Sequence, residues 1–354
     1  MKCLRFVMVG GFLGAGKTTA ISRLAHHYQN QGLKVGIVTN DQAQDLVDTL
    51  LLRSQGFSVE EVAGACFCCR FDDLVTRLGE LEEKNRPDIL LAEPVGSCTD
   101  LVATVVQPLR DLFQMRFEVA PYPVLFKPAH GLKILENQPS TGFSPKAAYI
   151  FLKQLEEADA IILNRMDELT PSQVDRLQAL VEDRFPGTPV LRFSARTGQG
   201  IEHLVAFLDQ QGPFGRKVLN IDYDVYAEGE AELGWLNATF SVQSNGPMNL
   251  DQFLLDLIQR LQQQLAGQGA EIAHLKVIGL GDTSFAVANA VSNQLIDNVS
   301  LKSEARVPSF DLIVNARVGI DPEILENLVR AVVPEMASSH HKAEATLQGV
   351  QSFR

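Results

Sequence analysis

The sequence contains no apolar run that approaches the roughly 20 residues of a membrane-spanning helix, and its 354 residues include only one tryptophan and five cysteines. Five cysteines are too few for a disulfide scaffold. Basic residues are in deficit, with 31 Lys and Arg against 43 Asp and Glu, so the chain lacks the broad positive surface that nucleic acids and anionic membranes bind. We therefore expect a cytoplasmic protein with reduced thiols and with neither nucleic-acid nor membrane partners.

Apolar runs and helical patterns alternate over the first 210 or so residues. The runs predict strands at residues 4–9, 34–39, 87–92, 123–126, 160–163 and 188–193. Helical patterns lie between several of them, at residues 20–29, 72–84, 145–157 and 171–184. This alternation indicates a doubly wound α/β domain over residues 1–212, with a mostly parallel sheet and helices on both faces.

A second, smaller α+β domain is predicted over residues 233–337, after a linker at 213–232. Its strands are expected at residues 235–242, 272–279, 284–291 and 310–318, and its helices at 249–265 and 321–333. Few residues separate these strands, so we expect an antiparallel sheet covered by the two helices. Residues 338–354 are polar, and their composition predicts a mobile tail.

The segment from Gly11 to Thr18 matches the pattern G-x-x-x-x-G-K-[ST] between an expected strand and an expected helix, the context that identifies a phosphate-binding loop. Glycines let backbone amides approach phosphate oxygens, and the helix dipole favours the negative charge. The Lys17 ammonium can reach the β- and γ-phosphates, and the Thr18 hydroxyl can ligate Mg²⁺. The expected phosphate-contacting residues are Gly11, Gly14, Ala15, Gly16, Lys17, Thr18 and Thr19.

Two further segments predict that the base is guanine. The Asp167 carboxylate can accept hydrogen bonds from the N1–H and the 2-amino group of guanine, a donor pair that adenine lacks. Both segments follow expected strands, at the sheet edge where ligands bind in open α/β folds. A helix cap after a strand is the competing interpretation of residues 164–167. The expected base-binding residues are Asn164, Arg165, Asp167, Ser194, Ala195 and Arg196.

Three of the five cysteines, Cys66, Cys68 and Cys69, lie within four residues. Thiolates select Zn²⁺ or similar soft ions over Mg²⁺, while buried small hydrophobes are the alternative interpretation. Ligation by all three thiols requires a bend near Phe67, because alternate residues of an extended segment point to opposite sides. A tetrahedral site needs a further ligand, for which the sequence offers Asp45, His130, His340 and His341. Cys98 is expected to be a packed small residue.

The order of these motifs resembles that of the CobW-type GTPases, relatives of the nickel-insertion GTPases of urease and hydrogenase maturation. The resemblance covers about residues 4–210 and is looser beyond. It implies a GTP- and Mg²⁺-binding protein with slow GTP hydrolysis, coupled to the binding of zinc or cobalt. The metal would be delivered to a client metalloenzyme or a cobalamin-related protein, and a nucleotide-dependent homodimer stays open.

The resemblance also implies roles for single residues. Glu93 would lie near Mg²⁺, Gly96 would sense the γ-phosphate, and Asp41 would be a Mg²⁺ ligand. The catalytic residues would then be Lys17, Asp41 and Glu93, and the magnesium ligands Thr18, Asp41 and Glu93. This chain departs from the family pattern at three positions: Gln44, Lys127 and Arg165.

Two other functions stay open. One is a nucleotide switch of the same fold that chaperones a cobalamin-dependent enzyme without handling metal. The other is a P-loop kinase of a small metabolite, which the two guanine-directed segments disfavour because nothing requires a kinase to bind guanine.

Overall fold

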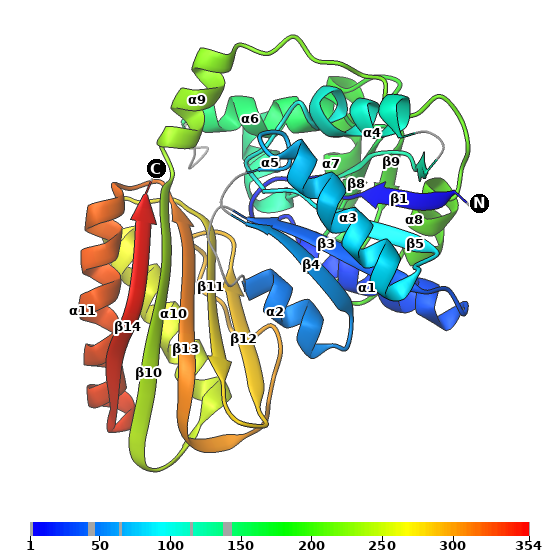
Figure 1. Ribbon diagram of the computed structural model, residues 1–354. Coiled ribbons are helices and arrows are strands. Elements are labelled where there is room, and N and C mark those ends of the chain that lie inside the picture. The colour runs from blue at the N-terminus through cyan, green and yellow to red at the C-terminus, as the bar shows by residue number, and fades with distance from the viewer. Residues whose placement is uncertain (1–2, 42–46, 64–65, 114–115, 137–143, 354) are drawn as a thin grey trace. The chain divides into compact units, whose positions relative to one another are not determined.

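The computed structural model describes residues 3–41, 47–63, 66–113, 116–136 and 144–353. The chain divides into two compact units, the first extending to Tyr226 and the second beginning at Ala227. The elements of the first unit follow the chain in Figure 1. They are β1 (Leu4–Met8), β2 (Gly10–Gly11), α1 (Lys17–Asn30), β3 (Val35–Asp41), α2 (Val47–Ser54), β4 (Ser58–Ala63), α3 (Phe71–Asn85), β5 (Ile89–Glu93), a π-helix (Val102–Val106), α4 (Gln107–Leu112), β6 (Phe117–Val119), β7 (Pro123–Phe126), α5 (Pro128–Leu135), α6 (Pro145–Glu156), β8 (Ala160–Leu163), a 3-10 turn (Met166–Glu168), α7 (Pro171–Arg184), β9 (Val190–Arg192), α8 (Ile201–Leu208) and α9 (Tyr223–Ala231).

Parallel strands form two sheets in the described part of this unit. The first has the order β4-β3-β5-β1-β6, and the second has the order β2-β7-β8-β9. Only Val9 separates β1 from β2, and its amide continues the pairing with β5 by donating to Ala92. The carboxyl ends of β1, β5, β7 and β8 therefore come together where the phosphate loop begins.

Helices pack on both faces of the first sheet. Leu91 of β5 belongs to a buried cluster with Ile21 and Leu24 of α1. The adjacent residue, Leu90, points to the opposite face, where it lies beside Gly36 together with Leu81 of α3. All five residues of β5 are buried, as expected for a strand covered on two sides. The predicted doubly wound α/β domain is confirmed.

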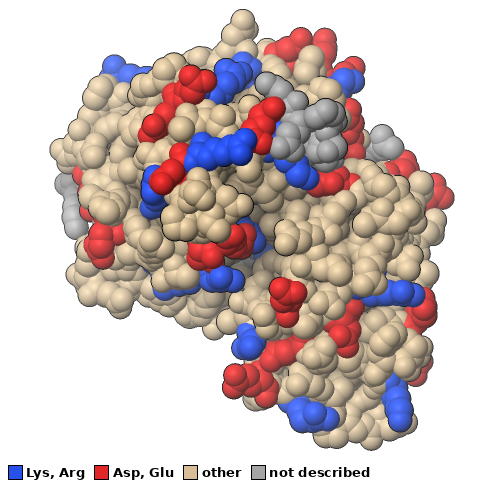
Figure 2. All heavy atoms as spheres, turned by 180° about the vertical axis from the view of Figure 1, so that it is seen from behind, with Lys and Arg blue, Asp and Glu red and all other residues tan. Residues whose placement is uncertain are grey.

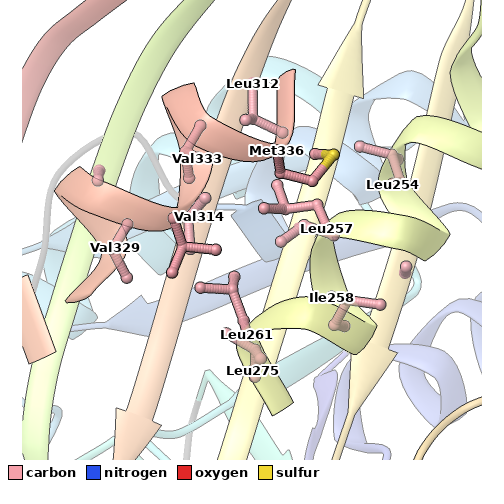
Figure 3. Close-up of a cluster of buried hydrophobic side chains, with 14 of the residues drawn as sticks. Leu254, Leu257, Ile258, Leu261, Leu275, Leu312, Val314, Val329, Val333 and Met336 are labelled. Carbon is pink, nitrogen blue, oxygen red and sulfur yellow. The ribbon is translucent and has the colours of Figure 1, made fainter. Parts of the chain in front are cut away.

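The second unit is an antiparallel sheet with two long helices. Its elements are β10 (Gly234–Asn249), α10 (Leu250–Gly267), β11 (Ile272–Leu280), β12 (Phe285–Ala290), β13 (Arg306–Val318), α11 (Pro322–His341) and β14 (Ala343–Phe353), and the strand order is β12-β11-β13-β10-β14. Figure 3 shows side chains of both helices directed at those of the strands. Leu257 of α10 and Val333 of α11 are fully buried against Val314 of β13 and its neighbours. One apolar face of the sheet thus provides the core, as the sequence predicts.

Two expectations for the sequence between and after the units are wrong. The acidic stretch within the expected linker includes helix α9, because the Asp222 carboxylate accepts from the amides of Asp224 and Val225 and so caps its first turn. The expected mobile tail is the end of α11 followed by β14, which pairs along β10. Ala343 is buried there, and Phe353 stacks on Trp235 with 5.9 Å between ring centroids.

Charged side chains of both signs are interspersed over the face of the molecule drawn in Figure 2. The excess of acidic residues is therefore not gathered into one field on that face. Among the helices of the described residues, none is both long enough and apolar enough to cross a membrane.

Candidate nucleotide and metal site

The phosphate loop is held in a conformation that only glycine adopts without strain. Gly11, Gly14 and Gly16 have φ values of 139°, 72° and 92°. Gly16 is the N-cap of α1, so no side chain covers the amides of the first helical turn. Within the loop, the Lys17 ammonium is buried and donates to the Gly11 carbonyl over 2.9 Å. Thr19 is exposed, one residue into the helix beyond Thr18.

The loop is joined to the end of β5 by two contacts. The Thr18 hydroxyl donates to the Glu93 carboxylate over 2.9 Å, and both side chains are buried. A methyl group at Gly96 would lie 2.9 Å from the Lys17 nitrogen and 2.8 Å from Leu13. Residues 93–96 thus lie directly against the group that would hold the terminal phosphate. An oxygen pair such as that of Thr18 and Glu93 suits Mg²⁺ or its bound water.

Asn164 connects the phosphate loop to the second guanine-directed segment. Its amide nitrogen donates to the Ala15 carbonyl over 2.7 Å, and its amide oxygen accepts from the Ala195 amide over 2.9 Å. The side chain is 1% exposed, so both contacts are shielded from water. Arg23 of α1, which sequence reasoning did not single out, holds the same segment by donating to the carbonyls of Ala195 and Arg196.

The Asp167 carboxylate is engaged by two side chains. It accepts from the Ser194 hydroxyl over 2.6 Å and pairs with the Arg196 guanidinium, also at 2.6 Å. Arg196 is 70% exposed, whereas Asp167 is 11% exposed. A guanine that binds to this carboxylate therefore replaces a solvated arginine, which costs little. Arg165 has a left-handed backbone conformation (φ 63°), and its guanidinium pairs with Glu168.

The cysteine turn, residues 66–69, has the bend that ligation by three thiols requires. The amide of Cys69 donates to the Cys66 carbonyl over 3.0 Å, closing a tight turn. The sulfur atoms of Cys66, Cys68 and Cys69 lie within 4.8 Å of one another and are the one such cluster found in the described part of the chain. The Cys66–Cys69 and Cys68–Cys69 sulfur distances are 3.1 and 3.9 Å. Phe67, by contrast, is fully buried and anchors the turn.

Asn40, at the carboxyl end of β3, also fixes this turn. Its amide oxygen accepts from the Phe67 amide over 2.7 Å, and its nitrogen donates to the Val62 carbonyl over 2.8 Å. Asp41 is the last residue of β3, where its backbone pairs with Ala63. Gln44 and Asp45 lie outside the described residues.

Cys98 is buried as expected, but it is not an isolated packed residue. Its sulfur is in hydrogen-bonding contact with those of Cys66 and Cys68. Hydrogen bonds from Cys68 and then Cys98 lower the pKa of the Cys66 thiol, while the hydrogen bond to Cys66 raises the pKa of each of the other two. One thiolate shared among three sulfurs is a nucleus for binding a soft cation. Spacing alone gave no signal for this contact, because it joins residues about 30 positions apart.

The histidines suggested as further ligands have other surroundings. His130 is buried, and burial followed by the charge of Lys127 lowers its pKa. His341 lies 3.0 Å from the Asp256 carboxylate and packs on the Phe253 ring within the second unit. Lys127, which departs from the family pattern, is fully buried and donates to the Leu13 carbonyl over 3.2 Å. It therefore supports the phosphate loop from below.

A strand, a glycine-rich loop and a helix with a buried lysine at its start define a P-loop nucleotide-binding domain. The family model of the CobW/HypB/UreG nucleotide-binding domain matches residues 5–192, just over half of the chain. The chain belongs to the CobW/HypB/UreG family, whose members are P-loop GTPases and metallochaperones.

Curated relatives match mainly the first unit. Over 179 residues the chain is 30% identical to the zinc chaperone YeiR of Escherichia coli strain K12, covering 48% of this chain and 49% of that protein. It is 23% identical over 213 residues to the zinc-regulated GTPase metalloprotein activator 1 of Dictyostelium discoideum, covering 52% and 44%. The chain thus spans about half the length of these two relatives.

Two solved structures extend the comparison. The Zn(II)-bound YjiA GTPase from E. coli aligns with 94% of this chain and 99% of its own, at 14% identity and a TM-score of 0.40. The hydrogenase maturation factor HypB from Archaeoglobus fulgidus aligns with 58% of this chain and 89% of its own, at 18% identity and a TM-score of 0.41.

Proposed function

We propose that this protein binds GTP and Mg²⁺, hydrolyses GTP slowly, and uses that cycle to bind and deliver zinc or cobalt. The observation that carries the proposal is the short covalent path between the two sites. Residues 93–98 begin at Glu93, which contacts Thr18, pass Gly96 beside Lys17, and end at Cys98 in contact with Cys66. A change at the terminal phosphate is thereby transmitted to the thiols without a long chain of contacts.

The residues around the loop fit a magnesium–GTP complex. Lys17 and the first amides of α1 would bind the phosphates, and Thr18, Glu93 and Asp41 would hold the magnesium ion. When bound, Mg²⁺ supplies positive charge against the developing charge on the phosphate oxygens. Asp167 and Asn164 orient the base, with Ser194, Ala195 and Arg196 completing its surroundings. We assign Lys17 and Glu93 to charge stabilisation, which predicts slow hydrolysis because no water-orienting residue is identified.

The transition metal is the cargo in this scheme. Thiolates of Cys66, Cys68 and Cys69 match the preference of Zn²⁺, and they tolerate Co²⁺. The zinc chaperone named among the relatives supports zinc. We assign client recognition to the second unit, for a client that is a metalloenzyme or a cobalamin-related protein in the cytoplasm.

A linked titration tests the proposal. We expect GTP affinity, measured by calorimetry in Mg²⁺ buffer, to change when Zn²⁺ or Co²⁺ is present, and metal affinity to change by the same factor when GTP is present. Lys17→Ala is expected to abolish GTP binding, and ATP is expected to compete poorly. Equal GTP affinities with and without metal would contradict the coupling and favour a nucleotide switch that handles no metal. Equal competition by ATP would contradict guanine recognition and favour a kinase.

A further inference from the structure

The interior side of the cysteine turn faces a fourth thiol from a different part of the chain. Cys98 is 1% exposed, and its sulfur is in hydrogen-bonding contact with the sulfurs of Cys66 and Cys68. Cys69 completes the group from the exposed side, 3.1 Å from Cys66. We propose that Cys98 is the fourth ligand of a four-thiolate metal site whose other ligands are Cys66, Cys68 and Cys69. This inference rests on the metal binding proposed above and names the ligand that it lacked.

The sulfur positions suit a tetrahedral site. Zinc–sulfur bonds of about 2.3 Å place the four sulfurs of a tetrahedron roughly 3.8 Å apart. The Cys68–Cys69 distance of 3.9 Å is already close to that value, and the Cys66–Cys69 distance of 3.1 Å needs a small opening. Because Cys69 is exposed and Cys98 is buried, an ion enters and leaves on the Cys69 side. Four thiolates favour zinc over oxygen-preferring ions such as Mg²⁺.

The backbone around Cys98 couples this ligand to the phosphate loop. The Gln154 amide nitrogen donates to the carbonyls of both Gly96 and Cys98, over 2.9 and 2.7 Å, and is itself buried. The Cys98 amide closes a turn onto the Val95 carbonyl. Residues 95–98 therefore move as one piece, with Gly96 against Lys17 at one end and the thiol at the other.

This arrangement gives the site a ligand that can be withdrawn. A closed four-thiolate site holds zinc tightly, whereas a site with an open position exchanges ligands. When γ-phosphate loss shifts Gly96, Cys98 moves with it, and the ion is left with three thiolates and an open position toward the exposed side. Withdrawal of one ligand is sufficient for transfer to a client, and no covalent or redox step is needed.

Counting thiolates around the bound ion tests the assignment. In the full-length protein without nucleotide, titrated with Co²⁺, we expect thiolate-to-cobalt charge-transfer absorption equivalent to four sulfurs per ion. Cys98→Ala should lower that intensity to about three quarters and weaken metal binding by about tenfold or more, since even indirect partners of a metal ligand contribute that much. Cys3→Ala, which removes an exposed cysteine outside the cluster, serves as the matched control. An unchanged spectrum and affinity in Cys98→Ala would overturn the assignment.

A measurement on the unaltered protein covers the case in which Cys98→Ala misfolds. X-ray absorption at the zinc edge should give four sulfur neighbours per ion, and three or fewer would overturn the assignment. The two levels of the argument fail differently. If the Cys66→Ala, Cys68→Ala, Cys69→Ala variant retains wild-type metal binding, the proposed metal function itself is wrong. If that variant loses the metal while Cys98→Ala keeps it unchanged, only the fourth ligand is wrong.

Discussion

The hydroxyl of Thr18 donates a 2.9 Å hydrogen bond to the carboxylate of Glu93, and this contact joins the first turn of α1 to the end of β5. Both side chains are buried. The pair places two oxygen donors beside the buried Lys17 ammonium, where opposite charges meet with little screening. The position of a magnesium ion is thereby set by the same residues that order the loop.

Glu93→Gln is expected to weaken the Mg²⁺ dependence of GTP binding. The amide keeps the size of the side chain but removes the negative charge that orients the Thr18 oxygen, and losses of this kind cost about 10–100-fold in metal affinity. GTP dissociation rates measured with and without Mg²⁺ provide the check. Glu83→Gln, an exposed substitution on α3, is the control. A variant whose Mg²⁺ dependence equals that of the wild type would remove Glu93 from the magnesium site.

Gly96→Ala is expected to impair binding of the triphosphate more than that of GDP. Its methyl group would lie 2.8–2.9 Å from Leu13 and the Lys17 nitrogen, where a γ-phosphate also needs room. Overpacking of this kind costs about 1–3 kcal/mol, equivalent to roughly 5- to 150-fold in affinity. Comparing GTP and GDP affinities tests this. Gly267→Ala, where an added Cβ has no neighbour within 4 Å, should leave both affinities unchanged.

Asp167→Asn is expected to reduce GTP affinity by roughly 100-fold or more, because a buried acceptor is replaced by a group that cannot accept from both guanine donors. The new amide can donate to the 2-carbonyl of xanthine, so affinity for xanthosine triphosphate should rise. Competition between the two nucleotides measures the change. Retention of full GTP preference would mean that residues 164–167 are a helix cap and not a base-binding segment.

Glu157 is expected to make the first unit less stable as the pH rises. Burial, and to a lesser extent the nearby charge of Asp100, raise its pKa to about 8 from an ordinary 4.5. Its folded-state pKa is the higher one, so its stabilising contribution is complete below about pH 4.5 and is lost as the pH approaches 8. The difference in unfolding free energy between wild type and Glu157→Gln should shift by up to about 1.4 kcal/mol per pH unit.

Urea unfolding at pH 5, 6, 7 and 8, followed by circular dichroism, provides the Glu157 measurement. The only tryptophan, Trp235, lies in the second unit, so its fluorescence reports on that unit as an internal reference. A free-energy difference that stays constant across this range would contradict the raised pKa.

Much of the fold follows from local patterns. The apolar runs at residues 123–126 and 160–163 coincide with β7 and β8, because a strand buried on both faces needs an unbroken apolar segment. The stripe of leucines in α10 likewise predicts the helix that covers the second sheet. β14 escaped prediction, since its polar, alternating sequence becomes ordered only by pairing with β10. Pairing of that kind depends on a partner that local composition does not encode.

What the sequence determined by itself is the chemistry with strict local requirements. Glycines at positive φ before Lys17, a carboxylate after β8, and three thiols within four residues are each readable because the chemistry demands those residue types at that spacing. Only the tertiary structure decided which distant groups meet them. Gln154 holds the Gly96 backbone, Asn40 holds the cysteine turn, and Cys98 joins its thiols. These contacts link segments that the chain brings together only after the sheet has formed, so no local period records them.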